Sequence, residues 1–478
     1  MITIPEMPID AYETDILSGD YEVRINGKPC QVLSCRVSAI PFNRIWPGYQ
    51  RSIDQTELAS HISFNADEEV TLEVISKRSF KRAVVRPLSK NIKVQTENEK
   101  ITFTLAKPGQ YVLEPDDEHF ALHIFFNGVE NYPEKDKATY YFGPGVHIPG
   151  IIKLKSNESI YIDAGAVVFG SVFCDGAENV KIFGHGIMDD SSEERAFYGA
   201  YTPGTKGNMK MYNTKNIEID GVIFRNSAIW VMAFFDCENI VINNIKIVGQ
   251  WRYNTDGIDL VNSSNITIKN TFVRAFDDVI SIKGIYESPK AVENILVENC
   301  VLWCGWGRTC EIGIETSAKE YKNITFKNCD LIHNSASAID IQNGNTGDIH
   351  NITFENLNVE YQVSTRLEIF QASDEQKYDG KITGVPILIW ADNHKFNTSR
   401  WKVDKNSFAG VRDILYKNIF VNAEKGVPPI KIHIMSLSEN TIFENFTIDG
   451  LFYNGKKVES LKEFIYETNN NVKNVILK

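Results

Sequence analysis

A short segment that recurs along the chain constrains the fold more than any other feature. Each copy begins with Asn or Asp and continues with apolar residues that alternate with polar ones. Six clear copies follow one another at intervals of 23, 26, 29, 29 and 28 residues, starting at Asn216, Asn239, Asn265, Asn294, Asn323 and Asn351. Weaker copies start at Asn179, Asp413, Asn440 and Asn474. Self-similarity at this period is the signature of a repeat protein.

The alternation within each copy has the period of a β-strand and leaves too few residues for a useful helix. One strand cannot bury its apolar side alone, but coils stacked at about 4.8 Å can pair as parallel strands around one interior. The leucine pattern of leucine-rich repeats is missing. We therefore expect an all-β chain built on a right-handed parallel β-helix. Its asparagines are expected at corners, where they tolerate a left-handed bend and form amide ladders.

The N-terminal part has a different texture. Short alternating segments are separated by polar turns, some of which carry Asn-Gly or Pro-Gly, as at Asn26-Gly27 and Pro108-Gly109. Strands at this spacing are typical of an antiparallel β-sandwich. The predicted organisation is an N-terminal β-sandwich domain over residues 1–130, a linker over 131–140 and a parallel β-helix catalytic domain over 141–478.

Composition narrows the partners. The net charge of −12 and a pI near 5.4 argue against binding to nucleic acid or to an anionic membrane. No apolar run is long enough to span a bilayer. The N-terminal residues Met1–Glu6 lack the basic start and apolar stretch of a secretion signal. We expect the chain to stay in the cytoplasm as written, and to be secreted or periplasmic if a signal has been removed.

The eight cysteines do not indicate a metal site. Cys300 and Cys329 occupy equivalent repeat positions, so both are expected to face the interior as small apolar residues. The spacing of Cys300, Cys304 and Cys310 is faintly metal-like, but no second Cys or His pair completes a zinc site. The prediction is buried, reduced thiols, with no metal and no other cofactor.

Three aspartates point to chemistry. Asp277 and Asp278 follow Asp256 by 21 and 22 residues, which is about one coil of the predicted helix. Three carboxylates would then meet on one wall, where their mutual repulsion raises at least one pKa and lets one act as an acid while another stays a base. A separation of one coil leaves the stereochemical outcome of such a reaction open. Carboxyl groups about 5 Å apart suggest retention of configuration, whereas a separation of about 6.5 to 9.5 Å suggests inversion.

These residues carry a resemblance. Asn254-Thr255-Asp256-Gly257 followed by Asp277-Asp278 is similar to the signature of the polygalacturonase family, glycoside hydrolase family 28, and of the related dextranase and isopullulanase family 49. The similarity spans roughly residues 140–450 and includes 141–147 and 164–168. A β-sandwich ahead of the helix resembles family 49 more closely.

The resemblance implies hydrolysis of a glycosidic bond with inversion, on a polysaccharide or oligosaccharide substrate. It implies that Asp277 is the general acid that protonates the leaving oxygen. Asp256 and Asp278 would hold and deprotonate the attacking water.

Departures from the family pattern favour a neutral sugar such as a dextran- or pullulan-like α-glucan. The Gly-His-Gly segment of polygalacturonases is replaced by residues 307–313, which contain no histidine. Their Arg-Ile-Lys, whose cations bind the uronate, is replaced by Asp340-Ile341-Gln342, which removes charge-assisted bonds. Lys283 and Arg308 remain as cations that can meet an acidic group, so a polygalacturonase-type pectin hydrolase is the alternative.

Aromatic side chains near the aspartates complete the candidate site, because their faces pack well on pyranose rings. Trp251, Tyr253 and Trp306 are the candidates, with Asn254 beside the first aspartate. Lys283 and Arg308 are predicted to bind substrate as well.

Two other classes of function remain open. A polysaccharide lyase on a β-helix would use carboxylates as Ca²⁺ ligands and a basic residue to abstract a proton beside a uronate. A non-catalytic carbohydrate-binding β-helix would bind a glycan without turnover.

Overall fold

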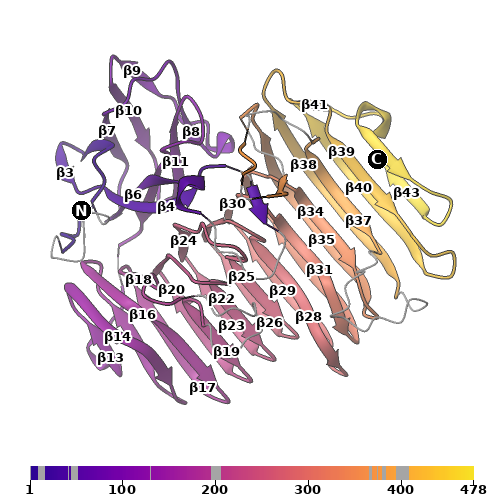
Figure 1. Cartoon of the computed structure of the whole chain (residues 1–478), viewed down its shortest axis with the longest axis horizontal. Coiled ribbons are helices and arrows are strands. Elements are labelled where there is room, and N and C mark those ends of the chain that lie inside the picture. The colour runs from indigo at the N-terminus through magenta and orange to yellow at the C-terminus, as the bar shows by residue number, and fades with distance from the viewer. Residues whose placement is uncertain are drawn as a thin grey trace.

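The computed structural model describes residues 2–8, 17–40, 42–44, 52–129, 131–194, 206–364, 369–373, 375–378, 384–393 and 409–478. Within these ranges the chain is all-β: it has strands and four short 3-10 turns, and no α-helix. Two small sheets come first and are followed by one continuous sheet of 30 strands. Figure 1 shows the small sheets lying against one side of a long, regularly coiled body.

The two small sheets form the predicted β-sandwich. Their strand pairs are antiparallel, apart from the parallel pair of β6 and β12. One sheet contains β1 (Ile2–Thr3), β4 (Leu33–Ser38), β6 (Thr56–Ala66), β8 (Ala83–Arg86), β11 (Gly109–Pro115) and β12 (Leu122–Asn127). The other contains β2 (Tyr21–Ile25), β3 (Lys28–Cys30), β7 (Val70–Ser76), β9 (Gln95–Glu97) and β10 (Lys100–Leu105). Their facing apolar residues make a separate core.

The 30-stranded sheet is the predicted parallel β-helix, which begins with β13 (Tyr140–Phe142) and β14 (Gly145–Leu154). Each coil adds a strand to each of up to three faces. The first face contains β19 (Met209–Tyr212), β22 (Met232–Phe235), β25 (Ile258–Val261), β28 (Ile280–Ser288), β31 (Arg308–Ala318), β34 (Ser337–Asn343), β37 (Ile387–Asp392), β39 (Lys431–Met435) and β42 (Ile465–Thr468). All pairs between successive strands of this face are parallel.

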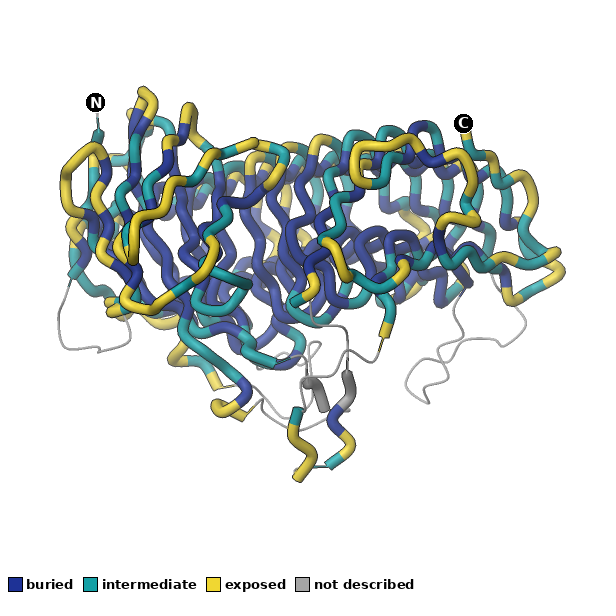
Figure 2. The backbone as a smooth tube through the Cα atoms, turned by 90° about the horizontal axis from the view of Figure 1, so that it is seen from above, coloured by how far each residue is buried: buried dark blue, intermediate teal, exposed yellow. Residues whose placement is uncertain are grey.

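The second face holds the asparagine repeats, in β17 (Glu178–Gly184), β20 (Lys215–Asp220), β23 (Glu238–Asn243), β26 (Ser264–Lys269), β29 (Val292–Glu298), β32 (Glu320–Lys327), β35 (Asp348–Tyr361), β38 (Val411–Ala423), β40 (Phe443–Tyr453) and β43 (Lys473–Leu477). The third face is shorter and contains β18 (Ile187–Asp189), β21 (Ile223–Arg225), β24 (Lys246–Val248), β27 (Phe272–Ala275), β30 (Val301–Cys304) and β33 (Asp330–His333). Inward-pointing Ile, Val, Leu and Phe side chains from all faces fill one core along the helix axis. In Figure 2 the buried residues, in dark blue, recur from coil to coil along the helix.

The asparagine corners take the conformation that the repeat predicts. The leading asparagines have φ between +54° and +60° in the clear copies, for example +60° at Asn239 and +58° at Asn265. Asn is among the few residues that adopt this left-handed region without large strain. Their amides ladder between coils: Asn294 Nδ2 donates to Asn265 Oδ1 at 3.0 Å, and Asn323 Nδ2 donates to Asn294 Oδ1 at 3.3 Å. These asparagines are therefore structural.

The sandwich packs on the third face of the helix. A shared apolar cluster joins Val37 and Phe125 of the sandwich to Ile223 and Phe272 of the helix. The last sandwich strand ends at Asn127 and the first helix strand begins at Tyr140. The division into two domains with a linker at 131–140 stays a prediction.

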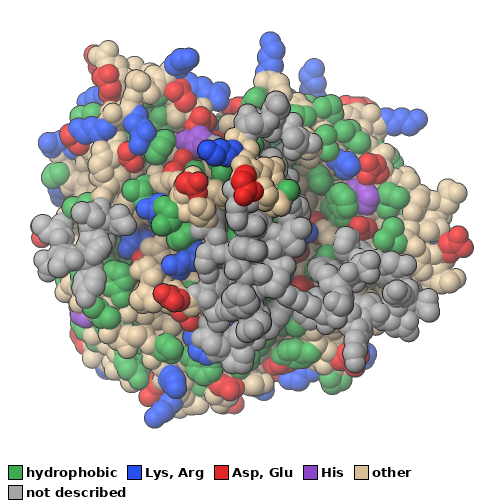
Figure 3. All heavy atoms as spheres, in the orientation of Figure 1, with side chains coloured by type: hydrophobic (Ala, Val, Ile, Leu, Met, Phe, Trp, Pro, Cys, Tyr) green, Lys and Arg blue, Asp and Glu red, His purple; other side chains and the backbone are tan. Residues whose placement is uncertain are grey.

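The eight cysteines are all buried and unpaired, as expected for reduced thiols, and Cys300 and Cys329 lie in the helix core. Among the described residues, no helix is long and apolar enough to cross a membrane. Likewise, no group of three or more His, Cys, Asp or Glu in those residues is arranged to hold a metal ion. In Figure 3, Lys and Arg side chains are interspersed with Asp and Glu on the visible face of the sandwich.

Candidate active site

The first face of the helix brings the three predicted aspartates together. Asp256 lies two residues before β25, and the pair Asp277-Asp278 lies just before β28 one coil later. The two turns stack, since the Gly257 N–H donates to the Asp278 carbonyl at 2.7 Å. The repeat spacing therefore places the carboxyl groups as the sequence predicts, and all three are at least 94% buried.

Strand alternation adds acidic residues that the motif did not reveal. Asp259 in β25 pairs with Ser281 in β28, which pairs with Glu311 in β31, which pairs with Asp340 in β34. The intervening Ile280, Ile312 and Ile339 point into the helix core, so this polar row points outward. We call these four residues the outward row. Three of its members are carboxylic acids.

Lys283 is the electrostatic centre of the site. Its buried ammonium contacts three carboxylates: Asp256 Oδ2 at 2.9 Å, Asp259 Oδ1 at 3.0 Å and Asp278 Oδ2 at 3.4 Å. The same ammonium lies 4.6 Å from the Trp230 ring centroid. These carboxylates hold the pKa of Lys283 well above its usual range, against the effect of burial. The predicted substrate-binding lysine is thus engaged with the catalytic candidates.

The environments of the adjacent aspartates push their pKa values apart. Burial would raise the pKa of Asp278, but Lys283, Arg308 and a hydrogen bond with Glu311 lower it to about 2. Asp277 has no such direct ion pair among the described residues. Burial, together with the charges of Asp256 and Asp278, raises the pKa of Asp277 well above its usual range. The surroundings therefore favour the protonated form of Asp277 and the ionised form of Asp278.

The pKa of Asp256 lies between those of Asp278 and Asp277. Burial raises its pKa, the nearby Lys283 lowers it and Asp278 raises it again, leaving a value of about 6. Its Oδ2 accepts from Lys283, while Oδ1 has no hydrogen-bond partner within the described part of the chain. A buried acceptor atom without a partner is costly unless a ligand or water meets it.

Glycine at position 307 makes room for the aspartate pair. A Cβ placed there would lie 2.5 Å from Asp277 Oδ1 and 2.6 Å from Asp278 Oδ1. Because both contacts are closer than real Cβ atoms allow, the two carboxyls sit directly against the Gly307 backbone. The turn that replaces the Gly-His-Gly segment of the resembled family is shaped to accept them.

Arg308 connects the aspartate pair to the outward row. Its backbone N–H donates to Asp278 Oδ1 at 3.1 Å, and its guanidinium lies 3.5 Å from the same oxygen. The guanidinium also approaches Glu311 Oε1 at 3.7 Å and Asp340 Oδ2 at 3.9 Å. With 26% of its side chain exposed, Arg308 is the accessible cation of this group.

Glu311 and Asp340 of the outward row are further functional candidates. Sequence reasoning missed Glu311 and noted Asp340 only as a departure from the family pattern. Glu311 accepts from Ser281 Oγ at 2.5 Å, and burial with the charge of Asp278 raises its pKa well above the usual range. Asp340 accepts from Ser337 and Gln342, and burial raises its pKa to about 7. The period-2 alternation of β31 and β34 is the signal that could have identified them.

The predicted aromatic residues lie in the turns around the aspartates. Phe276 connects two of them: Tyr253 lies 6.2 Å from its ring, and Trp306 stacks on it at 6.0 Å and 10°. Tyr253 is buried, whereas Trp251 is half-buried with Arg252 at 5.2 Å from its ring. Asn254 is half-buried and has φ +52°, so it turns the chain immediately before Asp256.

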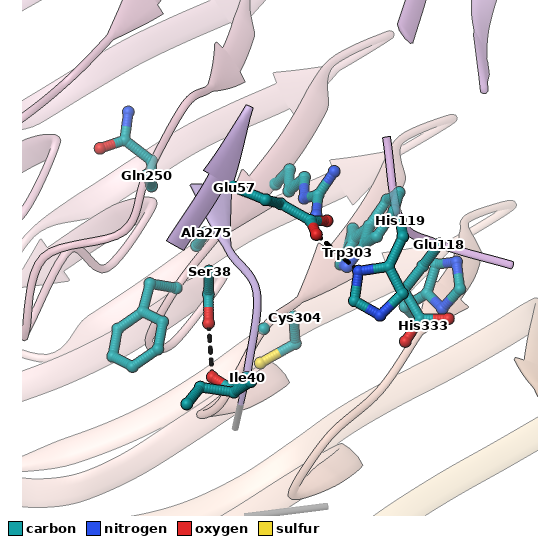
Figure 4. Close-up of a pocket in the computed structure, with 13 residues that line it drawn as sticks. Ser38, Ile40, Glu57, Glu118, His119, Gln250, Ala275, Trp303, Cys304 and His333 are labelled. Carbon is teal, nitrogen blue, oxygen red and sulfur yellow. Dashed lines mark hydrogen bonds and ion pairs between the residues drawn. The ribbon is translucent and has the colours of Figure 1, made fainter. Parts of the chain in front are cut away.

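A cavity of about 40 Å³ lies behind the turns, between sandwich and helix. Phe276 and Gly305 line it from the helix, and Glu57 and His119 from the sandwich. Figure 4 shows Glu57 hydrogen-bonded to His119, the two atoms being 2.6 Å apart. The sandwich thus reaches the back of the turn that carries Asp277.

Comparison with known proteins identifies the family of the chain. Residues 145–387 match the family described as Glycosyl hydrolases family 28. The chain is 28% identical over 210 residues to a probable exopolygalacturonase B of Neosartorya fischeri, covering 39% of this chain and 44% of the relative. It is 25% identical over 307 residues to a dextranase of Arthrobacter globiformis, covering 55% of this chain and 46% of the relative. The chain spans less than half the length of these two relatives.

The solved structure of Dex49A from Penicillium minioluteum aligns with 99% of this chain and 96% of its own, with a TM-score of 0.54. The sequence identity of that alignment is 15%, so it shows a shared fold alone. The parallel β-helix with an N-terminal β-sandwich is therefore an arrangement also found in a protein of known structure.

Proposed function

We propose, since the chain belongs to the glycosyl hydrolases of family 28, that it hydrolyses glycosidic bonds of a neutral polysaccharide or oligosaccharide by an inverting acid/base mechanism. The observation that carries this proposal is the cluster of three buried aspartates at Lys283, in which the surroundings raise the pKa of Asp277 and lower that of Asp278. Adjacent carboxyls whose environments separate their pKa values supply one acid and one base.

The proposed roles follow from the contacts. Asp277, held protonated, donates its proton to the leaving glycosidic oxygen as the bond to the anomeric carbon breaks. Asp278 and Asp256 hold a water molecule on the opposite face of the sugar and accept its proton as the new bond to oxygen forms. Lys283 keeps both of these carboxylates in place. The unpartnered Oδ1 of Asp256 is suited to accept from that water.

Neutral sugar is favoured by the charge of the outward row. Uronate recognition requires cations placed for charge-assisted bonds. Here Asp340 and Gln342 hydrogen-bond each other at 3.1 Å, and Glu311 occupies the neighbouring row position. Arg308 is already shared among Asp278, Glu311 and Asp340. An anionic sugar beside Glu311 and Asp340 would meet acids in place of cations and gain no charge-assisted bond from them, whereas hydroxyl groups could donate to them.

A polygalacturonase-type activity is the second candidate. Arg308 is 26% exposed, so its guanidinium can meet a carboxylate. Among the similar proteins, the one from Neosartorya fischeri is named a probable exopolygalacturonase B.

A substrate screen tests the proposal. The purified protein is incubated with dextran, pullulan, arabinan and polygalacturonate, and reducing ends are measured. We expect release from a neutral glycan to exceed release from polygalacturonate by at least about tenfold. A proton NMR time course of the same reaction should show the inverted anomer first. Dominant activity on polygalacturonate would overturn the neutral preference, and a retained anomer would overturn the assigned mechanism.

The pH profile provides a second prediction. Activity requires Asp256 ionised and Asp277 protonated, so kcat/KM should rise with pH through about 6 and fall again at higher pH as Asp277 loses its proton. Replacing Asp256 by Asn should remove the rise near pH 6 from the residual activity. A flat profile from pH 4 to 8 in the unmodified protein would contradict this assignment of roles.

A further inference from the structure

The outward row continues beyond Asp340 on the same face of the helix. Asp340 in β34 pairs with Trp390 in β37, and Trp390 pairs with His433 in β39. The flanking residues Ile389 and Ala391 belong to the helix core, so Trp390 points outward on the side that carries Glu311. Two coils separate Glu311 from Trp390, which is about 10 Å at the spacing of paired strands.

Trp390 is held as a flat platform. Its ring stacks on the His433 imidazole, with centroids 4.0 Å apart and planes inclined by 17°. The His433 ring is fixed in turn, because its Nδ1 lies 2.7 Å from Glu467 Oε2. Trp390 itself is half-buried. A rigid indole on an outward face is a surface on which the apolar side of a pyranose ring can pack.

Hydrogen-bond acceptors adjoin this platform. Asp340 is 1% exposed and accepts from Ser337 and Gln342 through Oδ2 alone. Its Oδ1 has no hydrogen-bond partner among the residues that the structure describes. Asp392 lies two residues after Trp390. Burial raises the pKa of Asp392 to about 6, although the Trp390 indole N–H acts in the opposite direction. Two carboxyl groups thus lie beside the indole, and within the described residues each has a buried Oδ1 without a hydrogen-bond donor.

From this arrangement we infer that Trp390, Asp340 and Asp392 form a distal subsite for a neutral pyranose unit of the substrate. The indole packs on the ring, and the two carboxyl groups accept from its hydroxyl groups. The inference rests on the proposed glycan substrate. Asp340 is one coil from Glu311 and Trp390 is two coils from it. One sugar ring does not span two coils, so the Trp390 indole contacts a sugar that is not adjacent to the cleaved bond.

A comparison of chain lengths tests the subsite. Isomaltose oligomers of two and six units serve as substrates for the Trp390→Ala variant. We expect KM for the six-unit oligomer to rise about tenfold with kcat nearly unchanged, while kcat/KM for the two-unit substrate stays the same. Trp390→Phe should restore most of the affinity. The matched control is Tyr141→Ala, which removes an exposed aromatic side chain from the edge strand β13, and it should change neither substrate.

Measurements of oligosaccharide binding distinguish a failure of this inference from a failure of the proposed function. The six-unit isomaltose oligomer and a six-unit galacturonate oligomer are titrated calorimetrically into Asp277→Asn and Asp277→Asn/Trp390→Ala. Weaker isomaltose binding in the double variant supports the subsite even if the unmodified protein shows no turnover. Equal effects of Trp390→Ala on short and long substrates, tighter Trp390-dependent binding of galacturonate, or no binding of either oligomer would overturn the inference.

Discussion

Asp277→Asn is expected to lower kcat by about 10²- to 10⁴-fold, the usual contribution of a positioned general acid. The amide is nearly the same size as the carboxyl but has no proton to give to the leaving oxygen. The buried position and the neighbouring carboxylates favour an uncharged group at this position already. Binding and folding should therefore be preserved. Initial rates by reducing-sugar assay and oligosaccharide affinity by calorimetry measure the two effects separately.

The control for Asp277→Asn is Asp175→Asn. Asp175 is an exposed residue at the end of β16 (Ala166–Asp175), outside the aspartate cluster, and its replacement should leave kcat unchanged. Normal turnover by Asp277→Asn would refute its role as the acid. If the unmodified protein binds glycans but hydrolyses none of them, the chain is a carbohydrate-binding β-helix, and Asp277→Asn should then bind equally well.

The repeat made most of the helix predictable because its signal is local. Asn239 and Asn265 mark corners through a backbone conformation that few other residues accept, and the alternation after each corner assigns the core side. The period of the repeat then stacks Asp256 beside Asp277 and Asp278. The sandwich was predicted from turn residues and alternation in the same local way.

The parts of the candidate site that the sequence did not predict depend on the register between coils. Glu311 and Asp340 align only when β31 and β34 are paired residue by residue, because insertions between coils vary in length. The clustering of carboxylates around Lys283 likewise needs the coils of β25 and β28 paired in register. The carboxyl groups of Glu311 and Asp340 also change the interpretation of Arg308. Its guanidinium approaches these two buried side chains and is partly exposed to solvent as well.

Contacts between the sandwich and the helix were the least predictable, since they join residues hundreds of positions apart. Arg86 in β8 is the main example. Its guanidinium lies 2.5 Å from Glu114 of the sandwich and also hydrogen-bonds Glu360 of the helix. Glu114 in turn lies 2.5 Å from His333 Nε2. All three charged side chains of the Arg86 cluster are at least 96% buried.

Arg86→Met is expected to lower the free energy of unfolding by about 3 to 5 kcal/mol, because it leaves Glu114 and Glu360 buried without their cation. Arg86 and His333 lower the pKa of Glu114 to about 2 against the effect of burial. In the native protein the stabilising contribution of Glu114 to the free energy of unfolding is thus present above its unfolded pKa, and it is lost as pH falls toward 2. Urea unfolding followed by circular dichroism at several pH values measures the loss.

Without Arg86 the sign of this pH dependence should reverse. Burial then dominates at Glu114, as it already does at Glu360, whose pKa is raised to about 7 even beside Arg86. A group whose folded pKa is raised destabilises the fold as pH rises through that pKa. The loss in free energy of unfolding caused by Arg86→Met should therefore be larger at pH 8 than at pH 5. Adding Glu114→Gln and Glu360→Gln should recover much of it, because no buried charge remains. Arg82→Met, which breaks a largely exposed pair with Glu424, should cost at most about 1 kcal/mol. An equal loss in both single variants would mean that burial of the charges is not what couples the sandwich to the helix.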